Sequence, residues 1–456
     1  MGVTVEALIR AAVPASEIVT GPPRDRPGDT WPTGMKRGPV GNAPAAVVKA
    51  GSAETVSAVL RAAAAAGATV QVEGARTNVV GCLDGSPDVV LRLAMDRIVD
   101  LDATSQVVTA EAGVIGGTLE DFLNDRGFTL GHYPQSLHHS TVGGWIATRA
   151  TGTASARFGG LEQMVRGLEG VLPSGETFSI GVRPRPPGGL DALQLLTGAE
   201  GSLAVITAAS LAVARLMDEI RLNGLVPDFG AGLEVQRELI QRAVPIGVVR
   251  LLNPAETAAV LAGAPDPAGA CLLVLSLVGD PAVTEVGRRV ATGAIGAAGG
   301  SVLGPDVADR WWDNRHAGPE LIKGLNRDAG SFFDTIEVGV PWRSATALAG
   351  ALQSEVGELA DRLWMHSSHV YSTGTGLYLA FWIDSTDDDT ACSRGRAVWE
   401  RAMDLADRHG GTIGHHHGIG AARSARYIES IEGRLHRSVK RALDPTGVLV
   451  ARLLDG

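Results

Sequence analysis

Apolar and polar positions in the first half of the chain alternate in short runs that predict strands, separated by longer runs with helical spacing. Ser52 precedes an alanine-rich run that Gly67 closes, and these are a favoured N-cap and a favoured C-terminal stop. We therefore predict a helix through Ala66. The predicted strands cover residues 45–49, 69–72, 89–93, 98–101 and 106–111, and a second helix covers 118–124.

The pattern changes near Ala214, where apolar strands begin to alternate with alanine-rich helices, as in a separate α/β unit. Beyond it we predict a helix over 397–408, a histidine-rich loop and a terminal helix over 428–443. Residues 20–42 are rich in Pro and Gly and indicate an extended arm. The pattern divides the chain into an N-terminal arm (1–40), two domains (41–213 and 214–395) and a C-terminal segment (396–456).

Composition narrows the classes of protein. Apolar residues make up 45% of the chain and charged residues 20%, which allows large cores and excludes wholesale disorder. The net charge of −10 offers no footprint for a nucleic-acid backbone, so we expect no nucleic-acid partner. The first ten residues lack a basic stretch followed by an apolar one, so we expect no signal peptide and a cytoplasmic protein.

Glycine is over-represented, with 59 in 456 residues, against a usual share of about 7%. One group is Gly-Ala-Arg-Thr-Asn-Val-Val-Gly at 74–81, between two predicted strands. Glycine lets backbone N–H groups approach a ligand, and successive amides can form an anion-binding nest. The Gly-x-Gly-x-x-Gly dinucleotide fingerprint is absent, and a plain strand connection is the alternative interpretation.

A second group runs from Gly131 to Gly160, where a polar loop enters Ser140-Thr-Val-Gly-Gly and a predicted helix. Ser140 or Thr141 can cap that helix and leave free N–H groups for a pyrophosphate. Gly143 and Gly144 would let a flat ring lie against the backbone. The alternative is a tightly packed turn.

Two shorter groups follow, Gly-Ala-Glu-Gly-Ser-Leu from 198 and Gly-His-His-His-Gly-Ile-Gly over 414–420. The first is equally consistent with an ordinary turn into a buried strand. In an extended segment His415 and His417 at most share a side, which is poor geometry for three ligands of one metal ion, so we expect no metal. Histidine suits acid–base chemistry near neutral pH, although a solvated loop is the alternative.

In this order, the motifs resemble those of FAD-binding flavoproteins of the vanillyl-alcohol oxidase type, over about residues 40–456. The segments Gly131-His-Tyr-Pro-Gln-Ser, Ser140–Gly152 and His415–Gly420 are most similar to the alkylglycerone-phosphate synthases (alkyl-dihydroxyacetonephosphate synthases). The resemblance implies an α+β fold. It comprises a two-part FAD-binding domain over 41–213, an α/β cap (substrate) domain over 214–395 and a C-terminal segment that returns to complete the active site. No histidine stands at the usual flavin-linking position of the first loop, so non-covalent FAD is implied.

The D-2-hydroxy acid dehydrogenases are the rival group within this superfamily. Their His-x-Gly-Asp-Gly-Asn-Leu-His and Gly-Glu-His-Gly motifs supply two His and a Glu as metal ligands. Here Tyr371 and Tyr378 stand at the two His positions and His416 stands at the Glu. Because neutral phenols are poor ligands for a divalent ion, metal-dependent hydroxy acid chemistry is disfavoured.

The resemblance implies a transferase of ether lipid biosynthesis. Such an enzyme exchanges the acyl group of acyl-dihydroxyacetone phosphate for a long-chain alcohol, through a flavin N5 adduct and without net redox change. The alternatives are an FAD-dependent oxidoreductase of a hydroxylated substrate, such as a 2-hydroxy acid, without the metal site, and a non-catalytic FAD-binding protein. Arg76, Asn78, Gln135 and Ala421 depart from residues common in the family and leave the native substrate open; Arg76 could pair with the FAD pyrophosphate or obstruct its cradle.

The resemblance assigns site residues in three groups. The catalytic group has Tyr378 as the acid–base residue, and its other members are His417, His416, His415, Arg250 and His132. The FAD-binding group is Gly74, Ala75, Arg76, Thr77, Asn78, Gly81, Pro134, Gln135, Ser136, Thr141, Gly143, Gly144, Thr148, Thr151, Glu200, Gly201 and Ile206. The substrate-binding group is Arg327, which matches a phosphate-binding arginine, Thr335 and Tyr371. We expect a small-molecule or lipid-like substrate, transient membrane contact and a homodimer.

Overall fold

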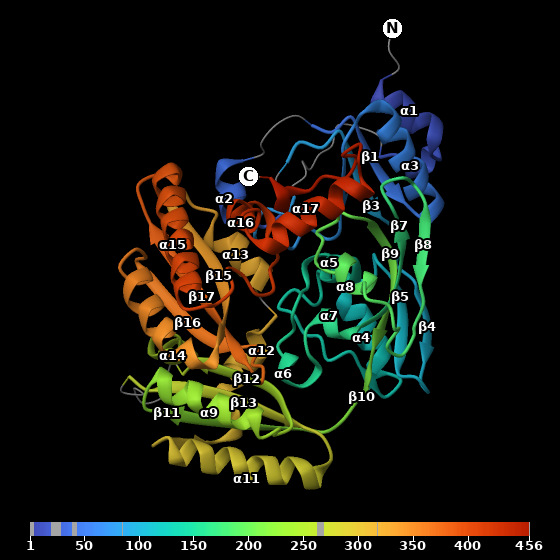
Figure 1. The fold of residues 1–456 in the computed structure, drawn as a ribbon. Helices are drawn as coiled ribbons and strands as arrows, with labels where there is room; N and C mark the ends of the chain where they lie inside the picture. The colour runs from blue at the N-terminus through green and yellow to red at the C-terminus, as the bar shows by residue number, and fades with distance from the viewer. Residues whose placement is uncertain are drawn as a thin grey trace.

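The computed structural model describes residues 4–19, 29–38, 43–83, 85–261, 269–316 and 318–455. Its N-terminal half holds a small parallel sheet and a larger antiparallel sheet (Figure 1). The parallel sheet has the order β1 (Ala46–Ala50), β3 (Val89–Leu93), β2 (Val70–Glu73). The antiparallel sheet has the order β4 (Ile98–Asp102), β5 (Val107–Glu111), β9 (Val205–Ala212), β7 (Val165–Val171), β8 (Thr177–Ile180). Short strands β6 (Phe128–Thr129) and β10 (Ala214–Arg215) pair beside it.

Local signals set the main helix of this half. Helix α3 (Ala53–Ala66) begins where the Ser52 side chain accepts a hydrogen bond from the Thr55 N–H, and it ends at Gly67 in the left-handed region, with φ of 65°. The other helices of this half are α1 (Val5–Ala12), α2 (Pro32–Arg37), α4 (Gly116–Asn124), α5 (Val142–Thr148), α6 (Ser155–Phe158), α7 (Leu161–Met164) and α8 (Ala192–Leu196). Helix α2 corrects the expected extended arm, because Pro at the first helical position and Lys36 and Arg37 in the last turn favour a helix there. Residues 20–28 and 39–42 of that arm lie outside the described ranges.

A seven-stranded antiparallel sheet forms the second half of the molecule, in the order β14-β11-β13-β12-β16-β17-β15. Its strands are β11 (Glu219–Val226), β12 (Ile246–Leu252), β13 (Cys271–Val278), β14 (Ser301–Leu303), β15 (Ser331–Pro341), β16 (Arg362–Ser368) and β17 (Gly374–Asp384). Its helices are α9 (Phe229–Gln241), α10 (Pro254–Val260), α11 (Pro281–Ala297), α12 (Asp309–Asn314), α13 (Gly318–Leu325), α14 (Trp342–Ala351) and α15 (Asp388–Arg408).

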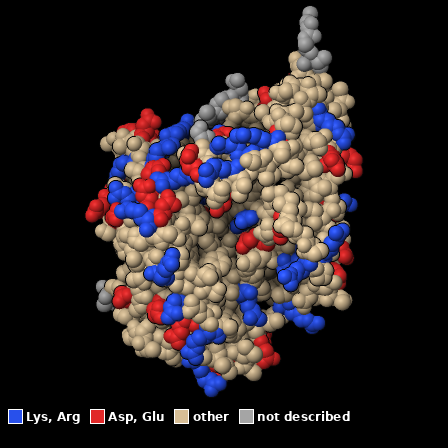
Figure 2. Space-filling model, viewed as in Figure 1, with Lys and Arg blue, Asp and Glu red and all other residues tan. Residues whose placement is uncertain are grey.

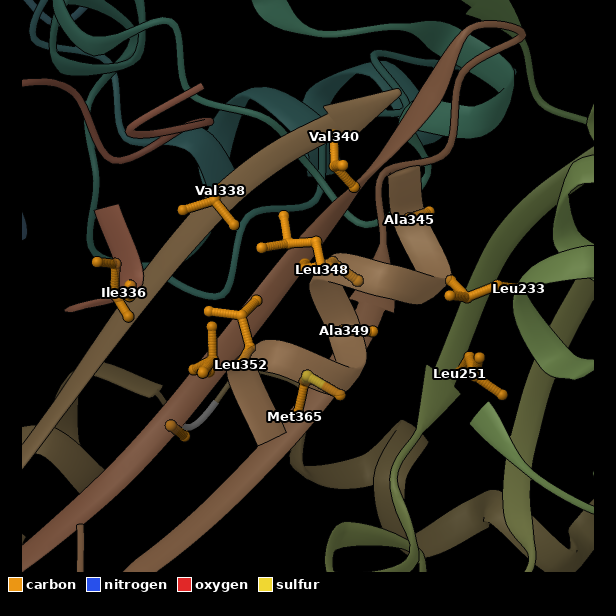
Figure 3. Packing of buried hydrophobic residues seen from close by; sticks show 14 of the residues in the cluster. Leu233, Leu251, Ile336, Val338, Val340, Ala345, Leu348, Ala349, Leu352 and Met365 are labelled. Atoms are coloured by element: carbon orange, nitrogen blue, oxygen red, sulfur yellow. The ribbon is translucent and has the colours of Figure 1, made fainter. Parts of the chain in front are cut away.

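The two faces of this sheet have different side chains because successive strand residues point to opposite sides. Figure 3 shows Ile336, Val338 and Val340 of β15 on the same side as Leu348 of α14, in one hydrophobic core. Thr335 and Glu337, which alternate with these apolar residues, must therefore point to the other face. The apolar core fixes the register, and the register places the polar residues.

The C-terminal segment crosses from the second half back to the first. A bridge joins Thr412 to Gly339 of β15, and another joins Leu449 to Val70 of β2. Between them lie α16 (Gly420–Tyr427) and α17 (Ile431–Leu443), the red helices above the centre of Figure 1. The expected single helix over 428–443 instead starts at Ile431, because Ser430 caps it.

The predicted α+β architecture, with a two-part N-terminal unit, an α/β cap and a returning C-terminal segment, is confirmed. The exact domain boundaries stay a prediction. No helix among the described residues is long and apolar enough to cross a membrane.

Candidate active site

A cavity of about 540 Å³ lies between the two halves of the molecule. All the predicted FAD-binding residues line it except Gly81, whose added Cβ would lie 2.7 Å from the Trp31 ring, so Gly81 serves close packing. The predicted catalytic and substrate residues on its wall are Tyr378, His416, His417, Arg250 and Thr335. The cavity therefore brings together glycine-rich loops of one half and the polar sheet face of the other.

The loop Gly74–Asn78 has the form of an anion cradle. A Cβ on Gly74 would lie 2.7 Å from Thr141 Oγ1, and Arg76 takes a left-handed φ of 60°. Within the described ranges, no acceptor is found for the backbone N–H groups of Ala75 and Thr77, which line the cavity. Unpaired neighbouring amides of this kind bind phosphate oxygens, so the loop fits the pyrophosphate of FAD.

The expectation that α5 leaves its first N–H groups free is wrong. The N–H groups of Val142 and Gly143 donate to backbone carbonyls of Val114 and Ala112, and that of Gly144 donates to Thr141 Oγ1 at 3.3 Å. The chain before α4 runs alongside the helix start and uses these donors. The N-terminus of α5 therefore forms part of the cavity wall but, within the described part of the chain, has no free N–H groups for a ligand. The Gly74–Asn78 loop is the better phosphate site.

Glu200 joins the cavity wall to the C-terminal segment. Its carboxylate accepts hydrogen bonds from the backbone N–H groups of Ile419 and Gly420 and from Cys82 Sγ. Asn78 adds a second tie, with Nδ2 donating to the His417 carbonyl at 2.7 Å. Residues on the cofactor side thus hold the histidine loop in place.

Tyr378 lies in β17 on the polar face of the sheet. In the register it is opposite Glu337 of β15 and His366 of β16, and its ring stacks on His366 with centroids 4.6 Å apart. The rings of His416 and His417 lie 6.1 and 5.6 Å from the Tyr378 ring. Burial raises the pKa of Tyr378, so its phenol stays protonated at neutral pH.

Arg250 belongs to a buried polar cluster below Tyr378. Its Nη2 lies 3.2 Å from Glu256 Oε1 and 3.0 Å from His366 Nδ1, and His366 Nδ1 lies 3.0 Å from Glu256 Oε2. Burial alone would raise the pKa of Glu256, but His366 and Arg250 outweigh it and lower the pKa to about 2. Burial first, then Arg250, lowers the pKa of His366 to about 4, so its ring is neutral. Arg250 is thus a fixed cation whose charge the Glu256 carboxylate balances.

Glu337 organises the histidine loop. Its Oε1 accepts hydrogen bonds from the backbone N–H groups of His415, His416 and His417 at 3.2, 3.2 and 3.0 Å. Its Oε2 accepts one from Arg423 Nη2 at 2.8 Å and lies 2.9 Å from His417 Nδ1. The latter contact is close but poorly aligned for a hydrogen bond. Burial would raise the pKa of Glu337, but Arg423 and then His417 hold it well below its usual range.

Besides Gly81, four predicted site residues do not reach the described cavity wall. His132 packs edge-on against Trp145 at 4.5 Å, and burial lowers its pKa to about 3. Arg327 is exposed after α13. Tyr371 and His415 lie behind His416 and bond to each other, with Tyr371 Oη 3.0 Å from His415 Nε2. The roles given to these four from the resemblance remain predictions.

Sequence reasoning missed the residues that support the site, namely Glu337, Arg423, Glu256, His366 and His369. One signal was available, since Glu337 and Asp334 are charged residues within a largely apolar strand pattern, Ser331–Pro341. The other four carried no local signal. Among the described residues, no group of three or more His, Cys, Asp or Glu side chains is placed to hold a metal ion.

Two family models match most of the chain. The model described as "FAD binding domain" covers residues 44–181, and the model for "FAD linked oxidases, C-terminal domain" covers residues 220–452. Tyr378, the histidine loop and Arg250 fall in the second match, and the Gly74–Asn78 loop falls in the first.

Individual relatives point to more than one activity. The chain is 28% identical over 433 residues to the uncharacterized FAD-linked oxidoreductase YgcU of Escherichia coli K12, covering 89% of this chain and 88% of that one. It is 27% identical over 470 residues to alkyldihydroxyacetonephosphate synthase of Trypanosoma brucei brucei, covering 92% and 74%. A solved structure of an alkyldihydroxyacetonephosphate synthase superposes with a TM-score of 0.72 at 23% identity, covering 90% of this chain and 77% of that one. The structural likeness establishes the fold alone.

Proposed function

The chain belongs to the FAD-linked oxidases of the vanillyl-alcohol oxidase type, and on that premise we propose that it is an FAD-dependent transferase similar to alkylglycerone-phosphate synthase. The proposed reaction replaces the acyl group of acyl-dihydroxyacetone phosphate, or of a similar ester, with a long-chain alcohol. The alcohol oxygen forms the new bond to the substrate carbon and gives up its hydroxyl proton, while the bond from that carbon to the ester oxygen breaks and the acyloxy group leaves as a carboxylate. Carbon oxidation states balance, so no net redox change is needed.

The observation that carries the proposal is the neutral Tyr378 phenol on the cavity wall, between two stacked neutral imidazoles and His417. The resemblance matches this tyrosine to the catalytic tyrosine of the synthases. A protonated phenol can donate to the departing carboxylate, since burial keeps its pKa raised. Tyrosines also stand at both positions where the metal-dependent D-2-hydroxy acid dehydrogenases have histidine ligands, which supports the transferase over that group.

FAD, when bound, supplies the flavin ring that activates the substrate carbon, and the protein side chains manage protons around it. Glu337 holds a negative charge 2.9 Å from His417 Nδ1, which favours a proton on Nδ1 and leaves Nε2 as an acceptor. Contacts of this kind often tighten only when substrate binds. His417 is therefore the base that we assign to the alcohol proton, and Arg250 is the cation that orients the polar end of the ester.

The test is to incubate FAD-loaded protein with acyl-dihydroxyacetone phosphate and hexadecanol, then measure the ether product and released acid by mass spectrometry. We expect product from the native chain and about 10²-fold or greater loss in Tyr378→Phe, with FAD still bound. Tyr427→Phe is the matched control, because its hydroxyl bonds to His436 Nδ1 at 3.1 Å, outside the cavity lining. No ether product under any lipid condition would contradict the proposed substrate, and full activity of Tyr378→Phe would contradict the assigned role.

A second candidate is an FAD-dependent oxidoreductase of a hydroxylated substrate, and the position of Arg327 favours it. The proposed phosphate-binding arginine is exposed and does not line the cavity. The relative YgcU also has an oxidoreductase name. Mixing the protein anaerobically with alcohols and 2-hydroxy acids should then bleach the flavin absorbance, and a panel without bleaching would count against this activity.

A lipid substrate requires access to a membrane surface, and α17 offers a candidate contact. Ile431 and Leu435 are 55% and 60% exposed on this helix, while Arg434 and Arg441 are exposed beside them. Figure 2 shows Lys and Arg side chains over α16 and α17, although the chain as a whole is acidic. We propose that this face binds anionic lipid transiently. Arg434→Gln with Arg441→Gln should reduce co-flotation with phosphatidylserine vesicles at low salt, and unchanged flotation would contradict the proposal.

The proposal leaves cytoplasmic location and homodimer formation as predictions. Fractionation of cells that express the chain would test the first, and light scattering of the FAD-loaded protein would test the second.

A further inference from the structure

Behind the cavity wall, three side chains form a continuous hydrogen-bonded row. His416 lines the cavity, and its Nδ1 lies 2.9 Å from Nδ1 of His415. His415 Nε2 lies 3.0 Å from the Tyr371 hydroxyl. Tyr371 is half-buried, and the next two residues in the chain, Ser372 and Thr373, are exposed. The row therefore runs from the reacting cavity to a half-buried phenol that belongs to an otherwise exposed stretch of chain.

We propose that Tyr371, His415 and His416 form a proton relay between the cavity and solvent. It rests on the proposed function only in one respect: a hydroxyl proton must leave the cavity. Exchange and oxidation both require this, because each removes a proton from a substrate hydroxyl group. Tyr371 and His415 act in it as relay residues that do not touch the substrate.

The tautomers of the row are coupled. An Nδ1–Nδ1 hydrogen bond needs one protonated and one bare nitrogen, so the two neutral imidazoles must carry their protons on opposite atoms. If His415 Nδ1–H donates to His416, then His415 Nε2 accepts from Tyr371 and His416 Nε2–H faces away from the pair. When every bond reverses, His416 Nε2 is bare and Tyr371 accepts. Moving one proton through the row converts one state into the other, with no net charge left inside.

Burial keeps the two imidazoles neutral, as a relay requires. Burial lowers the pKa of His415 to about 4, and burial followed by His417 and His369 lowers the pKa of His416 well below its usual value. The charged groups that face the row are Glu337 and Arg423 at the histidine loop, and Glu162 near Tyr371. Glu337 and Arg423 form an ion pair, so they leave little net field on the row.

His369 holds the side chains of the row in position. His369 stacks on His415 with centroids 5.3 Å apart and lies 4.6 Å from His416. Its backbone has a left-handed φ of 58°, which is strained for histidine, and its Nδ1 lies 2.9 Å from Ser155 Oγ of the other half. Such strain persists only where the surrounding structure imposes it, so the fold gives up some stability to place this ring.

The first experiment identifies the tautomers of the two histidines and needs no substrate. FAD-loaded protein is labelled with ¹⁵N-histidine, and two-bond proton–nitrogen NMR spectra report which ring nitrogen of each histidine carries the proton. The signals that disappear in His415→Gln and His416→Gln belong to these two residues. We expect opposite neutral tautomers for these two residues at pH 7, and a shift of the His415 Nε2 signal in Tyr371→Phe. Two identical tautomers, or a doubly protonated ring at pH 7, would overturn the relay even if no substrate were ever found.

The second experiment uses whichever substrate turns over. Tyr371→Phe should lower kcat about tenfold or more while KM stays unchanged, and added imidazole should restore part of the rate by carrying the proton itself. Tyr427→Phe, which loses a similar Tyr–His hydrogen bond, should behave as the native enzyme. An unchanged kcat in Tyr371→Phe, or a loss that imidazole cannot restore, would overturn the relay. A chain that turns over neither substrate class would contradict the proposed function, and the tautomer spectra would then support or overturn the relay by themselves.

Discussion

Replacement of Glu337 by glutamine should destabilise the molecule much more than the loss of one hydrogen bond. Both partners of the Glu337–Arg423 pair are buried, with side chains 1% and 0% exposed, so the variant leaves a buried guanidinium without its carboxylate. Breaking a buried ion pair from one side costs about 3–5 kcal/mol. Arg423 keeps hydrogen bonds to the carbonyls of Ile413 and Gly418, so we take the lower end, about 3 kcal/mol.

That cost should be visible in thermal unfolding. For a unit of 150–250 residues, 1 kcal/mol corresponds to about 2–4 °C, so Glu337→Gln should lower Tm by about 6–12 °C. The measurement is differential scanning fluorimetry at fixed FAD, protein concentration and scan rate. The glutamine retains an oxygen for the three backbone N–H groups of the histidine loop, so the loss reports mainly the missing charge.

Two further variants isolate the charge. Glu355→Gln removes a pair with Arg401 of similar length, 2.9 Å, whose side chains are 35% and 43% exposed, and such surface pairs contribute only about 0.2–1 kcal/mol. Glu337→Gln combined with Arg423→Met removes both buried charges and should recover most of the lost Tm, because an apolar replacement of a buried pair is often neutral. Equal Tm losses in Glu337→Gln and Glu355→Gln, or a double variant as unstable as the sum of its parents, would show that the uncompensated buried charge is not the cause of the loss.

Three other variants or conditions test the site. Gly74→Ala should weaken FAD binding roughly tenfold in a fluorescence titration, about 1.4 kcal/mol, because the added Cβ would lie 2.7 Å from Thr141 Oγ1. Gly350→Ala is the control, because its added Cβ would have no atom within 4 Å, and it should leave FAD binding unchanged. Equal effects of the two variants would argue against the anion cradle. The pKa values of His132 and His366 are lowered to about 3 and about 4 in the folded protein, against 6.5 for a free histidine, so on acidification the unfolded chain binds protons at these residues before the folded protein does. Tm should therefore fall as the pH drops from about 6.5 toward 4 and stay constant above pH 7. A Tm that does not change with pH would contradict the burial of these histidines in the neutral form. Arg250→Lys should keep FAD but lose about tenfold or more in kcat, because an ammonium cannot hold the fork to Glu256 and His366; undiminished turnover would remove Arg250 from the mechanism.

The sequence predicts best what local chemistry decides. Ser52 and Gly67 fixed the two ends of α3 because capping involves only neighbouring residues. Glycines in the first loop likewise indicated the cradle, since a left-handed turn and a close approach to backbone leave a compositional trace. Helix α17 started later than expected because an internal cap, Ser430, outweighed a continuous helical pattern.

Long-range contacts explain what the sequence could not predict. Glu337 bonds to His417 and Arg423, which lie 80 and 86 residues later, and no local pattern links such positions. The capping pattern predicted free N–H groups in α5, but residues 112–114 lie close enough to use them. For His132, a motif gives a position along the chain and not the direction of the side chain, which here packs against Trp145.

Charge balance in the cavity bears most directly on the choice between the two candidate activities. Near Tyr378 each buried cation has its own carboxylate, Arg250 with Glu256 and Arg423 with Glu337. The described lining offers no surplus cation at this end, because its other Lys and Arg residues lie in the first loop, β1 and β3. A phosphate dianion would gain little there unless Arg327 moved inward from its exposed position. The affinity of inorganic phosphate or glycerol phosphate for the FAD-loaded protein, compared between the native chain and Arg327→Gln, therefore separates a phosphorylated ester from a hydroxylated substrate that needs only one charged contact at Arg250.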